Sequence, residues 1–310
     1  MTAYLYAGQG AQYPGMGRDL AAASPAAAAV FGRAADTLGY DVLELDADDL
    51  RRTDRAQTAT FVHSLAADAA LRALCPAPEN LAYAGFSLGE WSALTAAGIL
   101  DFTSALRLLQ LRAEFMDAAC QDSAGAMVAV LGLEDEMILA ELCDERWVDT
   151  VFPANFNAPG QLVISGHETE VLAAAEVLQS RGARRTVRLD VAGAFHSPLM
   201  AGAAERLREA AAGLEPQAGR GLVMSSVYGE PLDGRDSLPD YLARQMTSPV
   251  RWSTAVRNLE RRGVDTWIEL GPGTVLSGLV RRQFRRHRIL HVDDAASLEQ
   301  TVEALNVTGL

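Results

Sequence analysis

The chain has 310 residues, of which 49% are hydrophobic and 22% charged, a composition typical of a globular protein with a large core. Its net charge of −13 excludes general binding to nucleic acid or to an anionic membrane surface. No basic stretch followed by a long apolar run opens the chain, and no apolar stretch approaches the length of a membrane span. Three widely spaced cysteines without metal-ligand spacing indicate a cytoplasmic protein and no metal site.

Strands and helices alternate over the first hundred residues. A short strand is predicted in AYLYAG and leads into a glycine-rich turn, GQGAQ, at residues 8–12. A long helix with an apolar stripe follows in QTATFVHSLAADAALRAL, and then a second strand in NLAYAGF. This alternation predicts an α/β fold with a mostly parallel sheet.

Between residues 125 and 191 the pattern changes to strand, helix, two strands, helix and strand. A turn at Ala158-Pro159-Gly160 joins the two central strands, and the second helix ends at Gly182. The order βαββαβ is that of the ferredoxin-like unit. We therefore expect a ferredoxin-like small domain, residues 125–191, inserted into a large domain made of residues 1–124 and 192–310.

The large domain resumes at AFHSPLM. Beyond it we expect a strand in GLVMSSV, helices near LPDYLARQM and STAVRNLERRG, and a strand in TWIELG. The arginine-rich segment VRRQFRRHRIL has helical spacing, which would place Arg281, Arg285 and Arg288 on one helix face.

One serine lies between two glycines where a predicted strand meets a predicted helix, in Gly85-Phe86-Ser87-Leu88-Gly89. Such a turn pushes the serine hydroxyl outward at a helix N-terminus, where it serves as a nucleophile. The same pattern also occurs in ordinary loops. A nucleophilic serine needs a neighbouring base, so the rest of the chain must supply one.

Among the five histidines, His196 is the candidate for that base. It lies in VAGAFHSPLM, where the small domain returns to the large one, and such junctions line clefts. A hydrogen-bonded structural histidine is the alternative. Oxyanion-binding backbone N–H groups are expected from Leu88, which follows the serine, and from Gln9, which lies between Gly8 and Gly10.

Seven ordered motifs resemble those of the malonyl-CoA:acyl-carrier-protein transacylases, a family that includes a fatty-acid-synthesis enzyme and the acyltransferases of polyketide synthases. The motifs are GQGAQ, GFSLGE, LRAEFM, NFNAPGQLVISG, AFHSPLM, RQMTSPVRW and ELGPGTVLSGL. They span nearly the whole chain. The resemblance implies an α/β-hydrolase-like large domain with a ferredoxin-like insert. It also implies transfer of a malonyl group from CoA to the phosphopantetheine thiol of an acyl carrier protein.

Position by position, the resemblance implies particular roles. Ser87 matches the nucleophile that carries the acyl group as an ester, and His196 matches its base. Gln9 and Leu88 match the donors of the oxyanion N–H groups. Arg112 matches the arginine that clamps the malonyl carboxylate, which a planar guanidinium meets with two parallel hydrogen bonds.

Further residues follow from the same resemblance. The carbonyl of Gln245 would orient the histidine, in the absence of an obvious acidic third member. Asn155 and Asn157 match asparagines near the pocket, with a purely structural role as the alternative. Phe195, beside the histidine, would disfavour an α-methyl branch on the acyl group. No metal and no bound cofactor is implied, since the CoA thioester is itself the substrate.

Three positions depart from the family pattern. Phe86 stands where the family has histidine, Ala7 where it has proline, and Ala59 where it has an active-site glutamine. Phe86 and Ala59 change the polarity and volume of the pocket and leave the acyl group open. The alternatives are transfer of a larger acyl group between carrier proteins, a thioesterase in which water takes the acyl group, and a non-catalytic carrier-docking module.

An acidic carrier protein would be repelled by the overall charge of this chain, so docking requires a local positive patch. Two arginine clusters qualify, one with Arg281 and Arg285 and one with Arg184 and Arg185 on the small domain. For both clusters a solvated charged surface is the alternative. Whether the pathway makes fatty acids or polyketides stays open.

Overall fold

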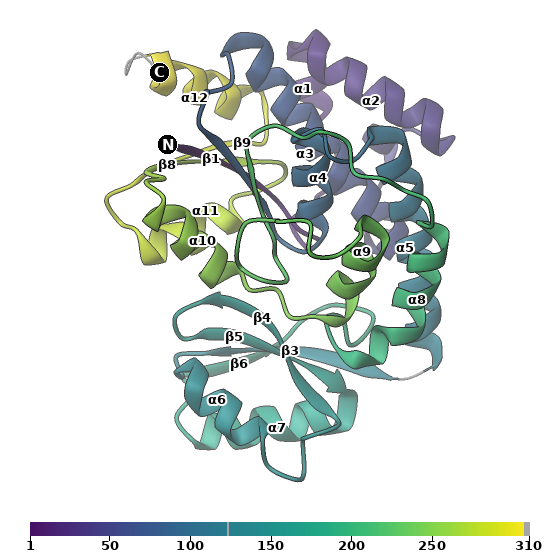
Figure 1. Ribbon diagram of the computed structural model, residues 1–310, viewed down its shortest axis with the longest axis vertical. Helices are drawn as coiled ribbons and strands as arrows, with labels where there is room; N and C mark the ends of the chain where they lie inside the picture. The colour runs from purple at the N-terminus through teal and green to yellow at the C-terminus, as the bar shows by residue number, and fades with distance from the viewer. Residues whose placement is uncertain (123, 307–310) are drawn as a thin grey trace.

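The computed structural model describes residues 1–122 and 124–306, and these form two β-sheets surrounded by helices (Figure 1). The larger sheet has five parallel strands in the order β7-β2-β1-β8-β9. The smaller sheet has four antiparallel strands in the order β4-β5-β3-β6. The predicted α/β class with a parallel sheet is confirmed.

The strands of the larger sheet are β1 (Thr2–Tyr6), β2 (Leu81–Gly85), β7 (Leu222–Met224), β8 (Thr266–Leu270) and β9 (Arg288–Val292). The helices packed around it are α1 (Arg18–Ala23), α2 (Pro25–Leu38), α3 (Thr53–Leu74), α4 (Leu88–Ala96), α5 (Phe102–Asp122), α8 (Ala201–Ala210), α9 (Leu238–Thr247), α10 (Trp252–Arg261), α11 (Val275–Gln283) and α12 (Ala295–Asn306). Among the described residues, no helix is both long and apolar enough to cross a membrane.

Both faces of the larger sheet are buried. Successive side chains of a strand point to opposite faces, so Tyr4 and Tyr6 of β1 join a core with α3 and α4, whereas Ala3 and Leu5 join a second core with α10 and α11. Sheets covered on both faces have nearly continuous apolar strands, which is why AYLYAG lacks polar alternation.

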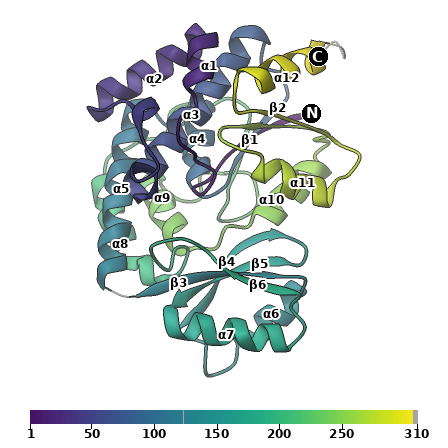
Figure 2. The same ribbon diagram turned by 180° about the vertical axis from the view of Figure 1, so that it is seen from behind.

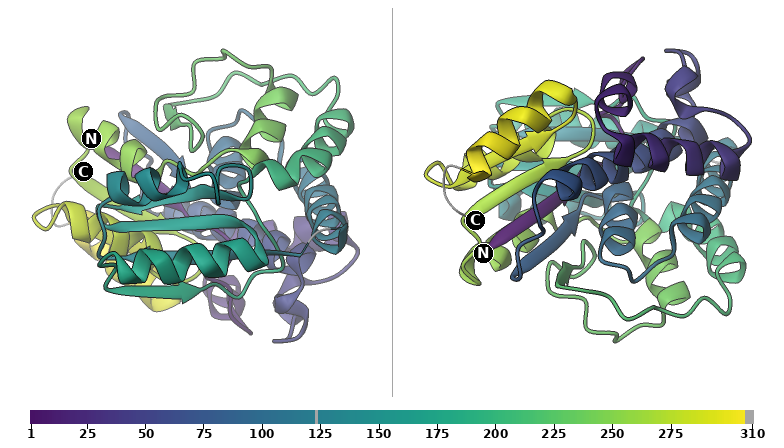
Figure 3. Two further views of the ribbon diagram at one scale, coloured as in Figure 1. Left: turned by 90° about the horizontal axis from the view of Figure 1, so that it is seen from below. Right: turned by 90° about the horizontal axis from the view of Figure 1, so that it is seen from above.

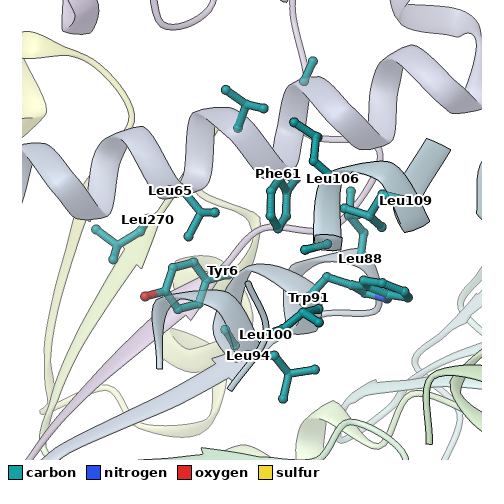
Figure 4. Packing of buried hydrophobic residues seen from close by; sticks show 14 of the residues in the cluster. Tyr6, Phe61, Leu65, Leu88, Trp91, Leu94, Leu100, Leu106, Leu109 and Leu270 are labelled. Atoms are coloured by element: carbon teal, nitrogen blue, oxygen red, sulfur yellow. The ribbon is translucent and has the colours of Figure 1, made fainter. Parts of the chain in front are cut away.

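Helix α4, which follows the candidate serine, is held firmly in the first of these cores. Figure 4 shows Phe61 of α3, Tyr6 of β1 and Trp91 of α4 pointing into the same interior. Every residue of α4 from Leu88 to Leu94 is buried. The helix N-terminus therefore has a fixed position relative to the strand ends.

The smaller sheet consists of β3 (Gly125–Leu131), β4 (Val151–Ala158), β5 (Gln161–His167) and β6 (Arg185–Arg188), with helices α6 (Asp135–Leu142) and α7 (Glu168–Ser180). The two helices cover one face, which is the outer face in Figures 2 and 3. Val128 and Ile164 pack against these helices, whereas Met127 and Val163 belong to the core of the larger part. The predicted element order is confirmed over this stretch.

A short backbone pairing fastens the smaller sheet to the larger part. Val250 donates its N–H to the carbonyl of Ala154 in β4 at 2.8 Å, and its own carbonyl accepts from the N–H of Phe156 at 2.9 Å. The segment between α9 and α10 is thereby clamped by β4. This segment contributes to the site described below.

The helical prediction for the arginine-rich segment is confirmed as far as Gln283 and is wrong beyond it. Helix α11 ends at Gln283, and Arg288 begins strand β9. Arg281, Arg285 and Arg288 therefore share no helix face. The segment pairs as a strand because Ile289 to Val292 lie beside β8, in register with Trp267 to Leu270, where sheet burial overrides helical spacing.

Candidate active site

Ser87 occupies a strained turn between β2 and α4. Its backbone has φ 52° and ψ −107°, a conformation that residues with a side chain rarely adopt. The flanking glycines make the turn possible, since a Cβ on Gly85 would lie 2.0 Å from the backbone of Gly89, and one on Gly89 would lie 2.0 Å from the carbonyl of Tyr6. The turn is strained and closely packed, as expected for an outward-facing nucleophile.

His196 lies directly beside this serine. Its Nε2 is 2.8 Å from Ser87 Oγ, and its Nδ1 is 3.1 Å from the carbonyl oxygens of both Gln245 and Ser248. Carbonyls only accept hydrogen bonds, so the proton resides on Nδ1 and the lone pair of Nε2 faces the serine hydroxyl. His196 itself has a positive φ of 59°. This pair has the geometry of an activated serine.

The charge state of His196 is set by its surroundings. Burial, together with the nearby Arg112 guanidinium, lowers the pKa of its imidazole to about 4. The ring is therefore neutral at physiological pH. A neutral imidazole can accept the serine proton, whereas an imidazolium cannot.

Gln245 fixes the serine turn as well as the histidine. Its side-chain Nε2 donates to the carbonyl of Ser87 at 3.1 Å, and its Oε1 accepts from Trp91 Nε1 at 2.9 Å. The backbone carbonyl of Gln245 thus contacts His196, which is the position that the family resemblance implied.

Two backbone N–H groups lie close to the serine. Leu88 is the first residue of α4, and the loop of Gln9 follows β1, which runs parallel to β2 with Tyr6 opposite Gly85. The carboxyl ends of neighbouring parallel strands meet at one edge of the sheet, so the two segments share one cavity. Within the described residues, neither N–H has a hydrogen-bond acceptor. Both remain open to a ligand.

A cavity of about 430 Å³ opens in front of Ser87 and His196. Its wall combines residues of the larger part with residues of the smaller sheet and of the connection that follows β6. Besides the residues already named, the wall includes Leu50, Arg51, Thr53, Phe86, Arg112, Met116, Met127, Asn155, Leu189, Asp190, Val191 and Phe195. A substrate in this cavity would contact both parts of the chain.

Arg112 is a buried cation in the wall of this cavity. The residue is 2% exposed, and burial lowers its pKa to about 10, which leaves it charged at neutral pH. Its Nη1 donates to Gln57 Oε1 at 2.7 Å, while its Nε has no partner. No carboxylate of the described residues pairs with it. A buried charge without a counter-charge is costly, so this site favours an anionic ligand.

Gln57 was missed by the sequence analysis. Its amide bridges two candidate residues, because Nε2 donates to Gln9 Oε1 at 3.2 Å while Oε1 accepts from Arg112. Ala59 is fully buried and lies outside the cavity wall, so the inference that the site lacks a glutamine in this helix is wrong. Placing the family's glutamine motif two residues earlier, in AQTAT rather than TATFV, would have found it.

The remaining candidates take different positions. Phe195 is buried in the cavity wall, and Asn155 lines the cavity from β4. Asn157 is also buried in β4 but does not line the cavity, and its Oδ1 has no hydrogen-bond partner. Phe86 lines the cavity and packs edge-on against Trp252, with ring centroids 5.8 Å apart. Phe86 therefore supplies an apolar wall beside the serine.

Taken together, a serine activated by histidine and two free N–H groups constitute the parts needed for acyl transfer. The model of the acyl transferase domain family matches residues 3–305 of the chain. The malonyl CoA-acyl carrier protein transacylase of Bacillus subtilis is 38% identical over 309 residues, covering 98% of this chain and 96% of that protein. The enzyme of the same name from Escherichia coli is 37% identical, covering 90% and 92%.

Solved structures agree with this assignment. The malonyl CoA-acyl carrier protein transacylase of Clostridium perfringens superposes with a TM-score of 0.93 at 34% identity, covering 99% of this chain and 98% of that one. A malonyl-transacylase in complex with its type II PKS acyl-carrier protein superposes with a TM-score of 0.90 at 35% identity, covering 98% of this chain and 99% of that one. The chain belongs to the acyl transferase domain family, among the malonyl CoA-acyl carrier protein transacylases.

The charge state of His196 predicts how the reactivity of Ser87 depends on pH. The rate of labelling by an uncharged fluorophosphonate should stay constant as pH falls through 6.5, the ordinary histidine pKa, and decline only toward the His196 pKa of about 4. Mass spectrometry measures the rate, with circular dichroism at each pH as the control for folding. A midpoint near 6.5 would show that His196 is solvated rather than buried.

Proposed function

We propose that this protein transfers a malonyl group from CoA to the phosphopantetheine thiol of an acyl carrier protein. One observation carries the proposal: the buried Arg112, which pairs with no carboxylate of the described residues, lines the same cavity as the Ser87–His196 pair. An acyl group that ends in a carboxylate would satisfy this cation while its thioester lies at the serine. The names of the relatives and the carrier-protein complex of one of them support the same activity.

In the first half-reaction, Ser87 Oγ attacks the thioester carbonyl carbon while His196 Nε2 takes the hydroxyl proton. The carbonyl oxygen becomes an oxyanion held by the N–H groups of Gln9 and Leu88. The C–S bond then breaks, CoA leaves as the thiol with the proton from His196, and a malonyl ester remains on Ser87. In the second half-reaction the carrier thiol gives its proton to His196 and attacks this ester, the C–O bond to Ser87 breaks, and Ser87 Oγ recovers the proton from His196. The kinetics are ping-pong.

His196 needs no acidic partner in this scheme. The carbonyls of Gln245 and Ser248 hold the Nδ1 proton and stabilise the transient imidazolium through their dipoles. No cofactor takes part in either half-reaction.

The acyl group is selected at three points. Arg112 would bind the malonyl carboxylate with its guanidinium, which Gln57 orients. Phe195 would restrict space at the carbon between carboxylate and thioester, against an α-methyl branch. The case for a larger acyl group rested on Ala59 and Phe86, and Gln57 removes the first of these two arguments.

We also assign the domains that the sequence suggested. A ferredoxin-like domain, residues 125–191, would be inserted into an α/β-hydrolase-like domain, residues 1–124 and 192–310. The element order and the strand order β4-β5-β3-β6 support the insert, and the serine turn after a central parallel strand supports the larger domain. A cytoplasmic location is supported by Cys75, Cys120 and Cys143, all of which are free thiols.

The docking surface for the carrier protein is assigned to Arg184 and Arg185. Both are exposed, and neither pairs with a carboxylate of the described residues. Strand β6, which Arg185 begins, continues into Leu189, part of the cavity wall. The other cluster is less suitable, because Arg286 and Arg288 line a hollow with Met1 at the amino ends of the strands, opposite Ser87.

Replacement of Ser87 by alanine should abolish the covalent intermediate. After mixing with malonyl-CoA, the intact mass of the wild type should rise by one malonyl group, and that of the Ser87→Ala variant should not change, because the serine is the nucleophile. A panel of other acyl-CoA thioesters serves as the control for the identity of the acyl group. An adduct that survives the substitution would place the ester on another residue.

Replacement of Arg112 should change the choice of acyl group. Arg112→Ala should slow malonyl transfer by roughly 10²-fold, since a buried charge-assisted contact is lost, and should spare or improve acetyl transfer. Arg112→Lys is the matched control, which keeps the charge without the planar fork and should lie between the two. The measurement is kcat/KM with each acyl-CoA. Equal losses with both substrates would make Arg112 purely structural.

Charge reversal at the docking surface should affect only the second half-reaction. The double variant Arg184→Glu/Arg185→Glu should slow transfer to the carrier protein and leave self-acylation from malonyl-CoA unchanged. Its deficit should shrink as salt is added, because screening weakens steering. The matched control is Arg281→Glu/Arg285→Glu, which changes the net charge by the same amount at a different surface of the protein. If the two double variants transfer equally fast, the small-domain arginines are solvated surface.

A further inference from the structure

Glu90 is a buried carboxylate that the proposed reaction does not use. It lies in the first turn of α4, three residues after Ser87, and is fully buried. It is not part of the cavity wall, so it cannot touch a substrate there. Because charges are rarely buried without purpose or partners, its contacts show what it does.

All the hydrogen bonds to the Glu90 carboxylate come from donor groups of neighbouring residues. The N–H and the hydroxyl of Ser226 donate at 2.8 and 2.6 Å, and the Tyr241 hydroxyl and Gln245 Nε2 complete the set. Two of these donors, the backbone N–H and the amide, cannot reverse their direction. Burial raises the pKa of Glu90, and the hydrogen bonds oppose that shift by stabilising the carboxylate. The cluster matches a carboxylate acceptor and no other group of this size.

One of these contacts leads to the catalytic pair through Gln245. The amide of Gln245 has a single orientation, because Oε1 accepts from Trp91 while Nε2 donates to Glu90 and to the carbonyl of Ser87. The backbone carbonyl of the same residue accepts from His196 Nδ1. Glu90 therefore holds the residue that touches both members of the pair.

A second path leads from Glu90 to the other acceptor of His196. Ser226, which donates twice to Glu90, accepts at its carbonyl from the N–H of Arg251 at 2.7 Å. Arg251 lies three residues after Ser248, whose carbonyl also receives the His196 Nδ1 proton. Both carbonyls that define the histidine tautomer are thus tied to one buried carboxylate.

We propose that Glu90 is a positioning residue for His196: it fixes, through Gln245 and Ser226, the two main-chain carbonyls that keep the Nε2 lone pair of His196 on Ser87. This inference rests on the proposed acyl transfer through Ser87. In serine–histidine–aspartate enzymes, an acid bound directly to the histidine has this orienting role. Here the carboxylate of Glu90 would have it without contacting His196.

The test is the variant Glu90→Gln. The glutamine has nearly the same shape, but either orientation of its amide brings an NH₂ group against a donor, Ser226 N–H on one side or Gln245 Nε2 on the other. Self-acylation by malonyl-CoA is measured in single turnovers over a range of concentrations. The maximal rate should fall by about 10²-fold, as for a displaced general base, with little change in the half-saturating concentration.

The matched control is Glu269→Gln. Glu269 is equally buried and accepts from the N–H groups of Leu276 and Ser277, so the substitution creates the same conflict of donors at a residue that does not line the cavity and has no hydrogen bond to Gln245. Both variants should lose thermal stability. Measured below both unfolding transitions, Glu269→Gln should acylate at the wild-type rate. Equal rates for Glu90→Gln and Glu269→Gln would overturn the proposal.

The double variant Glu90→Gln/Gln245→Ala distinguishes positioning from general destabilisation. If Glu90 acts through Gln245, its replacement should cost several-fold less activity once the Gln245 side chain is absent, because coupled residues are not additive. Fully additive losses would overturn the route through Gln245. If Glu90→Gln does not fold, Tyr241→Phe, which removes one donor from Glu90 and keeps the Gln245 side chain, should slow the reaction several-fold, and wild-type rates would contradict the proposal.

Failure of the proposed function would give a different result. In that case the wild type would gain no malonyl group, whereas labelling of Ser87 by a neutral fluorophosphonate would still report the Glu90→Gln effect on the Ser87–His196 pair. Normal malonyl loading of Glu90→Gln would refute the positioning role alone.

Discussion

The hydrogen bonds from His196 Nδ1 to two main-chain carbonyls are the interaction on which the site depends. They fix the tautomer, and the tautomer decides whether Nε2 can accept the proton of Ser87. Backbone carbonyls are themselves positioned by the fold. The carbonyl of Ser248 belongs to the segment that β4 clamps through Val250, and that of Gln245 lies in the last turn of helix α9. The orientation of one imidazole thus requires both sheets to be in place.

This dependence explains the insertion of one sheet into the other part of the chain. The cavity wall draws Ser87 and Gln9 from the carboxyl ends of parallel strands, and Met127 and Asn155 from the antiparallel sheet. Parallel strands bring their loops to one edge, where glycines allow close backbone approach, but they leave that edge open. The antiparallel sheet closes it with its inner face, while α6 and α7 protect the outer face (Figure 1).

The sequence predicted the parts of the site that depend on local chemistry. Ser87 follows from a Gly-x-Ser-x-Gly turn after an apolar strand, and the βαββαβ order follows from periodicity and turns. The structure brings Gln9, Leu88, Arg112 and Gln245 to the serine, as the motifs implied. Their catalytic roles stay predictions, since placement alone does not test them.

The sequence analysis failed where the structure or role of a residue depends on contacts with distant parts of the chain. Five arginines and histidines lie in strand β9 or just before it, so local sequence does not favour a strand there. The strand forms because it pairs with β8. Gln57 could be found only by placing the family motif two residues earlier, and that choice is settled by its bridge between Gln9 and Arg112, which joins three segments of the fold. Glu90 looks like an ordinary acidic residue in the first turn of a helix, a position that favours carboxylates by itself. Its burial and its four donors exist only in the folded chain.

Two buried ionisable residues, Glu90 and Arg112, lie near the catalytic pair, and they differ in how many hydrogen-bond partners they have. Glu90 accepts hydrogen bonds from four donors, so its carboxyl group is fixed in one orientation. Arg112 keeps its Nε unpaired and lowers the pKa of His196. In the proposed reaction a malonyl carboxylate cancels this positive charge, which raises the basicity of His196 when the thioester is in place. A neutral acyl group would leave this positive charge in place and His196 a weaker base. In the proposed reaction Arg112 would therefore select the substrate both by binding its carboxylate and by changing the basicity of His196.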